Sequence, residues 1–306
     1  MAPEPRPRGW AWSWPRLAIA GALVLAIAIA IAGVYNIRPG GATWNVTVLE
    51  GRPKVGWFRL DHAGKLAVGQ WLQTDSSSRA EIEIGQEGVV EVGPNSRVQL
   101  VAAQRTDHRL QLRRGLIHAR IWAPPGLFTV DTPWATAIDL GCMYTLKIAD
   151  DGSGLLRVES GWVAFAYGGT ESFVPAGASA QTRPRLGPGT PYFDDADPRV
   201  REALRRLDFE RMSDAERGAA LDEVLTAARP RDGLTLWHLL QRVHPGERER
   251  VFDRLAELVP PGSSITREGV LRGERRMLEA WWDQLDLQPL SWWRKWERPW
   301  PEEKSR

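Results

Sequence analysis

The most constraining feature of this sequence is a run of short apolar and polar alternations that recurs at a fixed pitch. In "EIEIGQEGVVEVGPNSRVQL", residues 81–100, two sets of apolar residues each stand eight positions apart: Ile82, Val90 and Val98, and Ile84, Val92 and Leu100. Alternation with a period of two predicts β-strands with one buried face. The constant pitch predicts that equivalent residues of successive strands lie in register and form a continuous apolar ladder.

The same kind of pattern fills residues 43–180. The apolar runs are too short for helices and are rich in β-branched and aromatic residues, and turn-forming residues separate them, as in "GPNS" at 93–96 and "DDGSG" at 150–154. We therefore predict an all-β domain of short antiparallel strands, arranged as a sandwich or as a solenoid-like stack. The polar side chains on the opposite face of the strands are expected to be solvated.

The period changes after this domain. Residues 181–197 are rich in Pro and Gly and are expected to form a linker. Asp197 followed by Pro198 is typical of a helix start, and Ser213 with Glu216 forms a capping-box pattern. Apolar residues at helical spacing then predict a module of four or five short amphipathic helices over residues 198–290. The expected fold class is therefore α+β, built from several modules.

Residues 17–34, "LAIAGALVLAIAIAIAGV", are uncharged and apolar, which predicts a single transmembrane helix. Arg6, Arg8 and Arg16 precede this segment and only Arg38 follows it closely, so residues 1–16 are expected to form a short cytoplasmic tail. A cleaved signal peptide is the alternative, because "AIA" at residues 30–32 fits a cleavage site. Either interpretation exports the rest of the chain across the inner membrane.

Tryptophans cluster near both ends of the sequence, in the tail 1–16 and in a Trp-rich tail at 291–306. The candidate contacts with a partner are Trp10, Trp12, Trp14, Trp292, Trp293 and Trp296. Tryptophan suits such contacts because its large ring also carries a polar N–H group. The alternative for the C-terminal tryptophans is packing against the helical module.

No catalytic, cofactor-binding or metal-binding pattern occurs in the sequence. The formal net charge is only +2, which gives no overall electrostatic attraction for nucleic acid. Cys142 is the only cysteine, so an intrachain disulfide is excluded, and a buried packing role is expected for it. The acidic clusters at 150–151 and 194–197 are better explained by turns and helix capping than by calcium. An enzyme is therefore not expected.

Four motifs within residues 69–177 together resemble the FecR family of bacterial transmembrane signalling proteins: "SRAEIEIG", "VDTPWA", "LGCMY" and "LLRVESGWVAF". The resemblance implies a periplasmic all-β domain behind one membrane span, which relays an envelope signal to an extracytoplasmic-function sigma factor or its regulator. It also implies structural roles, in turns, close backbone approaches and core, at five positions: Thr132, Pro133, Gly141, Gly161 and Val163.

Two features depart from the family. The 16 residues before the span are too few to build a core, so we expect them to fold on a protein partner. The C-terminal module is expected to be helical and not mixed. Two functions are therefore carried forward: a membrane-anchored signalling protein with a partner in the envelope, and a periplasmic scaffold that binds peptidoglycan or polysaccharide without signalling inward.

Overall fold

A computed structural model describes residues 42–287, which form one compact unit. The predicted span 17–34 and the tails 1–16 and 291–306 lie outside the described residues. Within residues 42–287, no helix is long and apolar enough to cross a bilayer.

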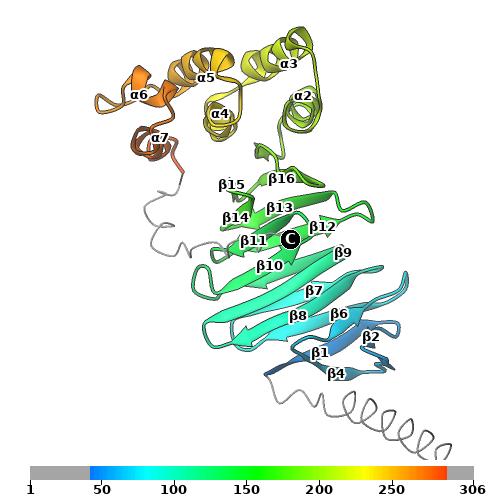
Figure 1. The fold of residues 1–306 in the computed structure, drawn as a ribbon. Coiled ribbons are helices and arrows are strands. Elements are labelled where there is room, and N and C mark those ends of the chain that lie inside the picture. The colour runs from blue at the N-terminus through cyan, green and yellow to red at the C-terminus, as the bar shows by residue number, and fades with distance from the viewer. Residues whose placement is uncertain (1–41, 288–306) are drawn as a thin grey trace, which may run out of the picture. The chain divides into compact units, whose positions relative to one another are not determined.

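The described residues form an α+β fold in which the strands precede the helices (Figure 1). The strands are β1 Thr43–Glu50, β2 Lys54–Val55, β3 Phe58–Arg59, β4 Ala63–Ala67, β5 Trp71–Gln73, β6 Arg79–Ile84, β7 Gly88–Val92, β8 Arg97–Gln104, β9 Asp107–Ile121, β10 Phe128–Thr132, β11 Ala135–Asp139, β12 Met143–Ile148, β13 Gly154–Ser160, β14 Trp162–Tyr167, β15 Thr170–Pro175, β16 Ala178–Arg183, β17 Gly187–Pro188 and β18 Tyr192–Phe193. The helices are α2 Pro198–Phe209, α3 Asp214–Ala227, α4 Gly233–Leu240, α5 Pro245–Leu258, α6 Arg267–Leu271 and α7 Arg275–Trp282, with a 3₁₀ turn at Pro230–Asp232.

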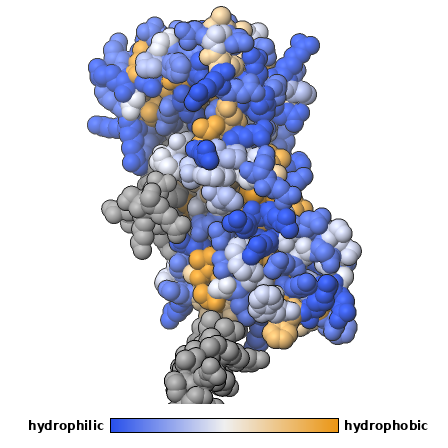
Figure 2. All heavy atoms as spheres, turned by 45° about the vertical axis from the view of Figure 1, so that its right-hand side comes forward, coloured by the Kyte–Doolittle hydropathy of each residue, from blue (hydrophilic) through white to orange (hydrophobic). Residues whose placement is uncertain are grey.

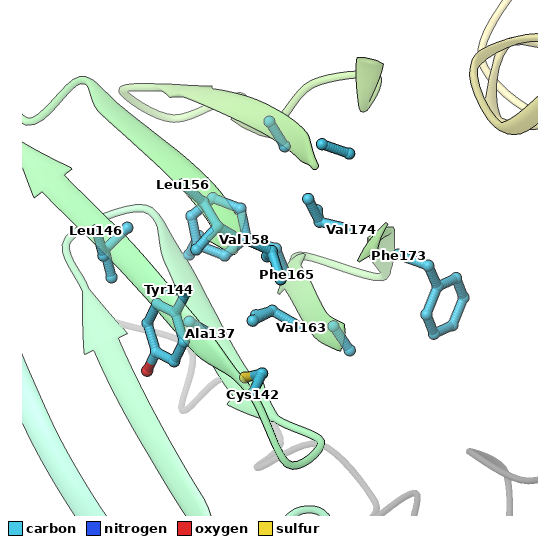
Figure 3. Packing of buried hydrophobic residues seen from close by; sticks show 14 of the residues in the cluster. Ala137, Cys142, Tyr144, Leu146, Leu156, Val158, Val163, Phe165, Phe173 and Val174 are labelled. Carbon is cyan, nitrogen blue, oxygen red and sulfur yellow. The ribbon is translucent and has the colours of Figure 1, made fainter. Parts of the chain in front are cut away.

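The strands form two sheets that share β9 and enclose one apolar core, which is a β-sandwich. Sheet A contains β1, β4, β6, β7, β12, β13, β16, β17 and β18, and sheet B contains β2, β3, β5, β8, β10, β11, β14 and β15. Figure 3 shows Tyr144 and Leu146 of sheet A in the same packed cluster as Val163 and Phe165 of sheet B. All four side chains are buried, because alternate residues of each strand point inward.

Strand β9 corrects one detail of the strand prediction. The sequence indicates two strands, "RLQLRRG" and "LIHARI", but the structure has one strand that passes from sheet B to sheet A. The change of sheet occurs at Gly115, whose φ of 99° favours glycine. A Cβ atom at this position would lie 2.2 Å from Ser96 Oγ, so a side chain does not fit.

The pairing of β9 with β10 is parallel, which contradicts the prediction of purely antiparallel strands. His108 lies opposite Phe128, and Gln111 lies opposite Asp131. The reason is the path of β9: the chain leaves sheet B, crosses to sheet A, and returns through residues 122–127. It therefore enters β10 beside the start of β9 and in the same direction, as in one coil of a solenoid.

The predicted apolar ladder forms at only one pair. Ile82 lies opposite Val90, but Ile84 lies opposite Gly88, and Val98 belongs to β8 in the other sheet. Antiparallel strands run in opposite directions, so a constant offset along the sequence can match only one pair of partners. The burial prediction is confirmed, because all six repeated residues are buried.

The segment 181–197, predicted as a linker, contributes to sheet A. Strands β17 and β18 pair with β16, and Tyr192 and Phe193 are buried. Pro and Gly limit these strands to two residues each, but they do not prevent pairing at the edge of a sheet.

The helix starts follow the sequence prediction, and the last helix differs from it. The Asp197 side chain accepts a hydrogen bond from Arg199 N, and Ser213 and Glu216 form the predicted capping box. The helix expected after Arg267 is divided into α6 and α7 at Gly273, whose φ of 74° ends α6. The described residues therefore contain six α-helices instead of four or five.

Candidate functional site

The helical module is joined to the β-sandwich by a buried aromatic cluster. Phe173 of β15 lies with its ring 5.6 Å from that of Trp282 of α7, and Trp237 of α4 lies 4.7 Å from Trp282. Both pairs have edge-to-face geometry, which is favourable for aromatic rings. The cluster fixes α4 and α7 against the edge of sheet B that β15 forms.

His238 lies inside this cluster and ties α4 to the backbone of β15. Its Nε2 atom accepts a hydrogen bond from Phe173 N at 3.1 Å, and its Nδ1 atom lies 2.8 Å from Leu234 O. The ring must therefore carry its proton on Nδ1. Burial, and to a smaller extent the charge of nearby Arg242, lowers the pKa of His238 to about 3. The histidine is thus a neutral structural link and not an acid or base.

A second link between the helical module and the β-sandwich consists of charged groups. Arg242, just after α4, donates hydrogen bonds to Ser172 Oγ at 2.7 Å and to Glu171 O at 3.0 Å. Asp208 of α2 accepts hydrogen bonds from Thr190 N at 2.7 Å and Thr190 Oγ1 at 2.9 Å. Burial raises the pKa of Asp208 and lowers that of Arg242, while their opposite charges partly offset both shifts. Arg242 thus holds the module to β15, and Asp208 holds it to the segment that follows β17.

Two clefts lie side by side at this junction. One has a volume of about 310 Å³ and is formed by the β14–β15 turn, α4 and α7. The other has a volume of about 270 Å³ and is formed by the β16–β17 turn, α2 and the end of α4. Thr170 and Gln241 line both. The walls mix aromatic, aliphatic and charged side chains, which suits a peptide segment of a protein partner.

The acidic residues of the described part of the chain form no metal-binding group. Among residues 42–287, no group of three or more His, Cys, Asp or Glu side chains could hold a metal ion. The acidic residues considered for calcium serve local structure: Asp151 accepts hydrogen bonds from Ser153 N and Oγ, and Asp195 pairs with Arg229 and Arg231.

A buried carboxyl group directly precedes the "LGCMY" motif. Asp139 is 1% exposed and accepts a hydrogen bond from Gly141 N at 2.7 Å and another from the Cys142 thiol. Burial raises the pKa of Asp139 to about 7, although these hydrogen bonds oppose the shift. Burial and the adjacent Asp139 raise the pKa of the Cys142 thiol well above its usual value. The predicted packing role of Cys142 is confirmed.

The other motif positions have the predicted structural roles. Thr132 Oγ1 accepts a hydrogen bond from Ala135 N and donates one to Ala135 O, which closes the turn after β10. Gly161 has a φ of 71°, and a Cβ atom there would lie 2.2 Å from Gly141 O. Val163 is fully buried. These residues shape the turns and the core of the domain.

The candidate partner contacts named from the sequence all lie outside the described residues: Trp10, Trp12, Trp14, Trp292, Trp293 and Trp296. Sequence reasoning missed the junction. One signal could have found it: all eight residues of α4, "GLTLWHLL", are buried, and an apolar sequence on every side of a short helix indicates burial between two layers.

Residues 70–164 match the family model described as FecR protein. No curated protein matches the chain. Two crystal structures from Parabacteroides distasonis ATCC 8503, each named as a putative anti-sigma factor, are similar to it. The structure at 2.50 Å is 13% identical with a TM-score of 0.36, and the similarity covers 44% of this chain and 62% of that chain. The structure at 1.65 Å is 14% identical with a TM-score of 0.36, and the similarity covers 51% of this chain and 74% of that chain.

This chain spans less than two thirds of the first of these structures. The family match runs from the start of β5 into β14, so it includes the change of sheet at Gly115 and the turn at Gly141. The family that this model describes is regulatory. All of the residues that match the FecR model lie in the β-sandwich.

Proposed function

We propose that this chain is a membrane-anchored periplasmic regulator, which relays an envelope signal through protein–protein contacts. The observation that carries the proposal is the FecR match over residues 70–164, behind the apolar segment 17–34. In this proposal the chain crosses the bacterial inner membrane once, with residues 1–16 in the cytoplasm. The cytoplasmic partner is an extracytoplasmic-function sigma factor or its regulator, contacted through the tryptophans of that tail.

The periplasmic partner would occupy the junction clefts. A peptide seated there would contact the β14–β15 turn, α4 and α7 at once. The aromatic cluster and the Arg242 and Asp208 ties hold these elements in place before binding. A preformed site avoids part of the ordering cost of association.

The first test is crosslinking of the intact protein in its native membrane, compared with a variant that lacks residues 2–15. We expect a sigma factor or other cytoplasmic regulator to be recovered only with the intact tail. Recovery of envelope proteins alone, unchanged by the deletion, would exclude inward signalling. Retention of the protein on purified peptidoglycan would then support the scaffold function instead.

The second test addresses the clefts. Gln241 is exposed and lines both of them, so Gln241→Arg places a long charged side chain in the binding region with little effect on the core. Ser264→Arg, at an exposed loop position of the same module, is the matched control. We expect Gln241→Arg to abolish the periplasmic crosslink while Ser264→Arg leaves it intact. Equal crosslinking by both variants would place the partner elsewhere.

A further inference from the structure

Three large aromatic side chains stand on the surface of the β-sandwich. Trp57 is 94% exposed, Phe58 77% and Trp122 64%. Figure 2 shows a face on which most of the surface is hydrophilic and hydrophobic side chains are scattered. Burying a Phe side chain gains about 1.5–3 kcal/mol relative to leaving it in water. Three such rings left in solvent are available to an apolar or interfacial partner if they lie on one side of the sandwich.

Two of the rings lie beside the start of β1. Trp57 and Phe58 form the tip of the β2–β3 hairpin, where Gly56 N donates a hydrogen bond of 2.9 Å to Trp71 O. Trp71 directly follows the four-residue turn 67–70 that ends β4, and this turn begins beside Thr43, the first residue of β1. The hairpin tip is thus a few residue lengths from the point where the chain enters the sandwich.

The third ring lies on the same side. Trp122 N donates to Glu87 O at 2.9 Å, and its indole N–H donates to Gln86 O, which holds the ring against the β6–β7 turn. That turn follows the β6 residues that pair with the beginning of β1, where Asn45 lies opposite Glu83. Strands β1, β6, β7 and β9 are consecutive neighbours in sheet A. β1 and β9 are therefore three strand spacings apart, which is about 14 Å.

Basic side chains flank the hairpin tip. Lys54 and Arg59 lie opposite each other just behind Trp57 and Phe58, and both are exposed. Arg52 is also exposed and pairs with Asp61 at 2.7 Å. Aromatic rings with adjacent lysine and arginine are the combination that binds the interface of a membrane containing anionic phospholipids.

We propose that the aromatic rim, defined as Trp57, Phe58 and Trp122, rests in the interfacial layer of the membrane that anchors the chain. This inference rests on the proposed function, because it takes residues 17–34 as a membrane span. Eight residues, 35–42, separate that segment from Thr43, and the connection reaches about 30 Å at most when fully extended. The side of the sandwich that carries the rim is therefore held near the bilayer, where its rings leave water.

The test places a fluorescent label at position 57. Cys142 is 2% exposed and its thiol has a raised pKa, so an introduced surface cysteine reacts selectively. The full chain carrying Trp57→Cys is labelled and reconstituted into vesicles of phosphatidylethanolamine and phosphatidylglycerol, with and without a lipid that carries a quencher near its headgroup. The matched control is Leu186→Cys, a 54% exposed position in the β16–β17 turn, away from the rim.

We expect the quencher lipid to remove most of the fluorescence at position 57 and almost none at position 186. Flotation of the same vesicles reports separately on anchoring. A chain that floats with the vesicles but shows equal, weak quenching at both positions overturns the rim proposal alone. A chain that does not float overturns both the anchoring and the rim. Strong quenching at both positions would also overturn it, because contact would then not be specific to the rim.

Discussion

Asp139, the buried carboxyl group directly before the "LGCMY" motif, is expected to make the stability of the fold depend on pH. Its pKa in the folded protein is about 7, whereas an unfolded chain has a value of about 3.9. Between these values the folded state binds more protons than the unfolded state does. The stability that this group contributes is therefore complete below about pH 4 and is lost as the pH rises through about 7.

The size of this effect follows from the shift. Three pKa units at 1.36 kcal/mol each amount to about 4 kcal/mol in the free energy of unfolding. Asp139→Asn cannot ionise and removes the pH dependence at this site. It keeps an oxygen that can accept the Gly141 hydrogen bond, and any loss at the Cys142 contact adds an offset of about 1 kcal/mol that does not change with pH.

The assay is urea unfolding of the wild type and of Asp139→Asn at a series of pH values from 4 to 8, followed by tryptophan fluorescence. Subtracting the two curves cancels other titrating groups. One of them is His238, whose lowered pKa makes stability rise with pH between about 3 and 6.5. We expect the stability of the wild type relative to the variant to fall by about 4 kcal/mol across the range. A difference that stays constant with pH would refute the account of the buried carboxyl.

Three further substitutions, and Gly69→Ala as the control for the first, test the fold by the same unfolding measurement. Gly115→Ala should lower the free energy of unfolding by more than about 2 kcal/mol, because the added Cβ atom would meet Ser96 and the φ of this residue is positive. Gly69→Ala has a positive φ but open surroundings, so it should lose only the backbone strain of about 1 kcal/mol. Similar losses for the two variants would contradict the steric argument. His238→Leu should cost about 1–3 kcal/mol, because Phe173 N loses its buried acceptor, and an unchanged stability would remove the histidine as a link. Ser213→Ala should cost about 1 kcal/mol by removing the α3 cap, whereas an alanine variant as stable as the wild type would show that the cap is dispensable.

The sequence predicts the features that depend on neighbouring residues. Alternation identified the buried positions of β6 to β8, and capping residues identified the starts of α2 and α3. It does not predict which strands pair, because pairing depends on the path of the whole chain. The crossing at Gly115 separates β8 from β7 and makes β9 parallel to β10, and a single glycine in "LRRGLI" does not specify this.

The candidate site was less predictable for the same reason. The junction brings together Phe173, Thr190, Asp208 and His238, which are separated by many residues in the chain. Each is unremarkable in its own segment. The membrane segment and the terminal tryptophans stay predictions, because they lie outside the described residues.

Strand β9 also has a mechanical consequence. Two sheets that are joined only by loops can slide over each other, but here one continuous backbone is hydrogen-bonded into both. A displacement applied to either sheet is carried through covalent bonds to the other. The helical module is fastened to β15 in sheet B, and the aromatic rim draws on both sheets. We therefore expect the domain to move as one rigid body, so that a force that tilts the helices also tilts the end of the sandwich at which the chain enters β1.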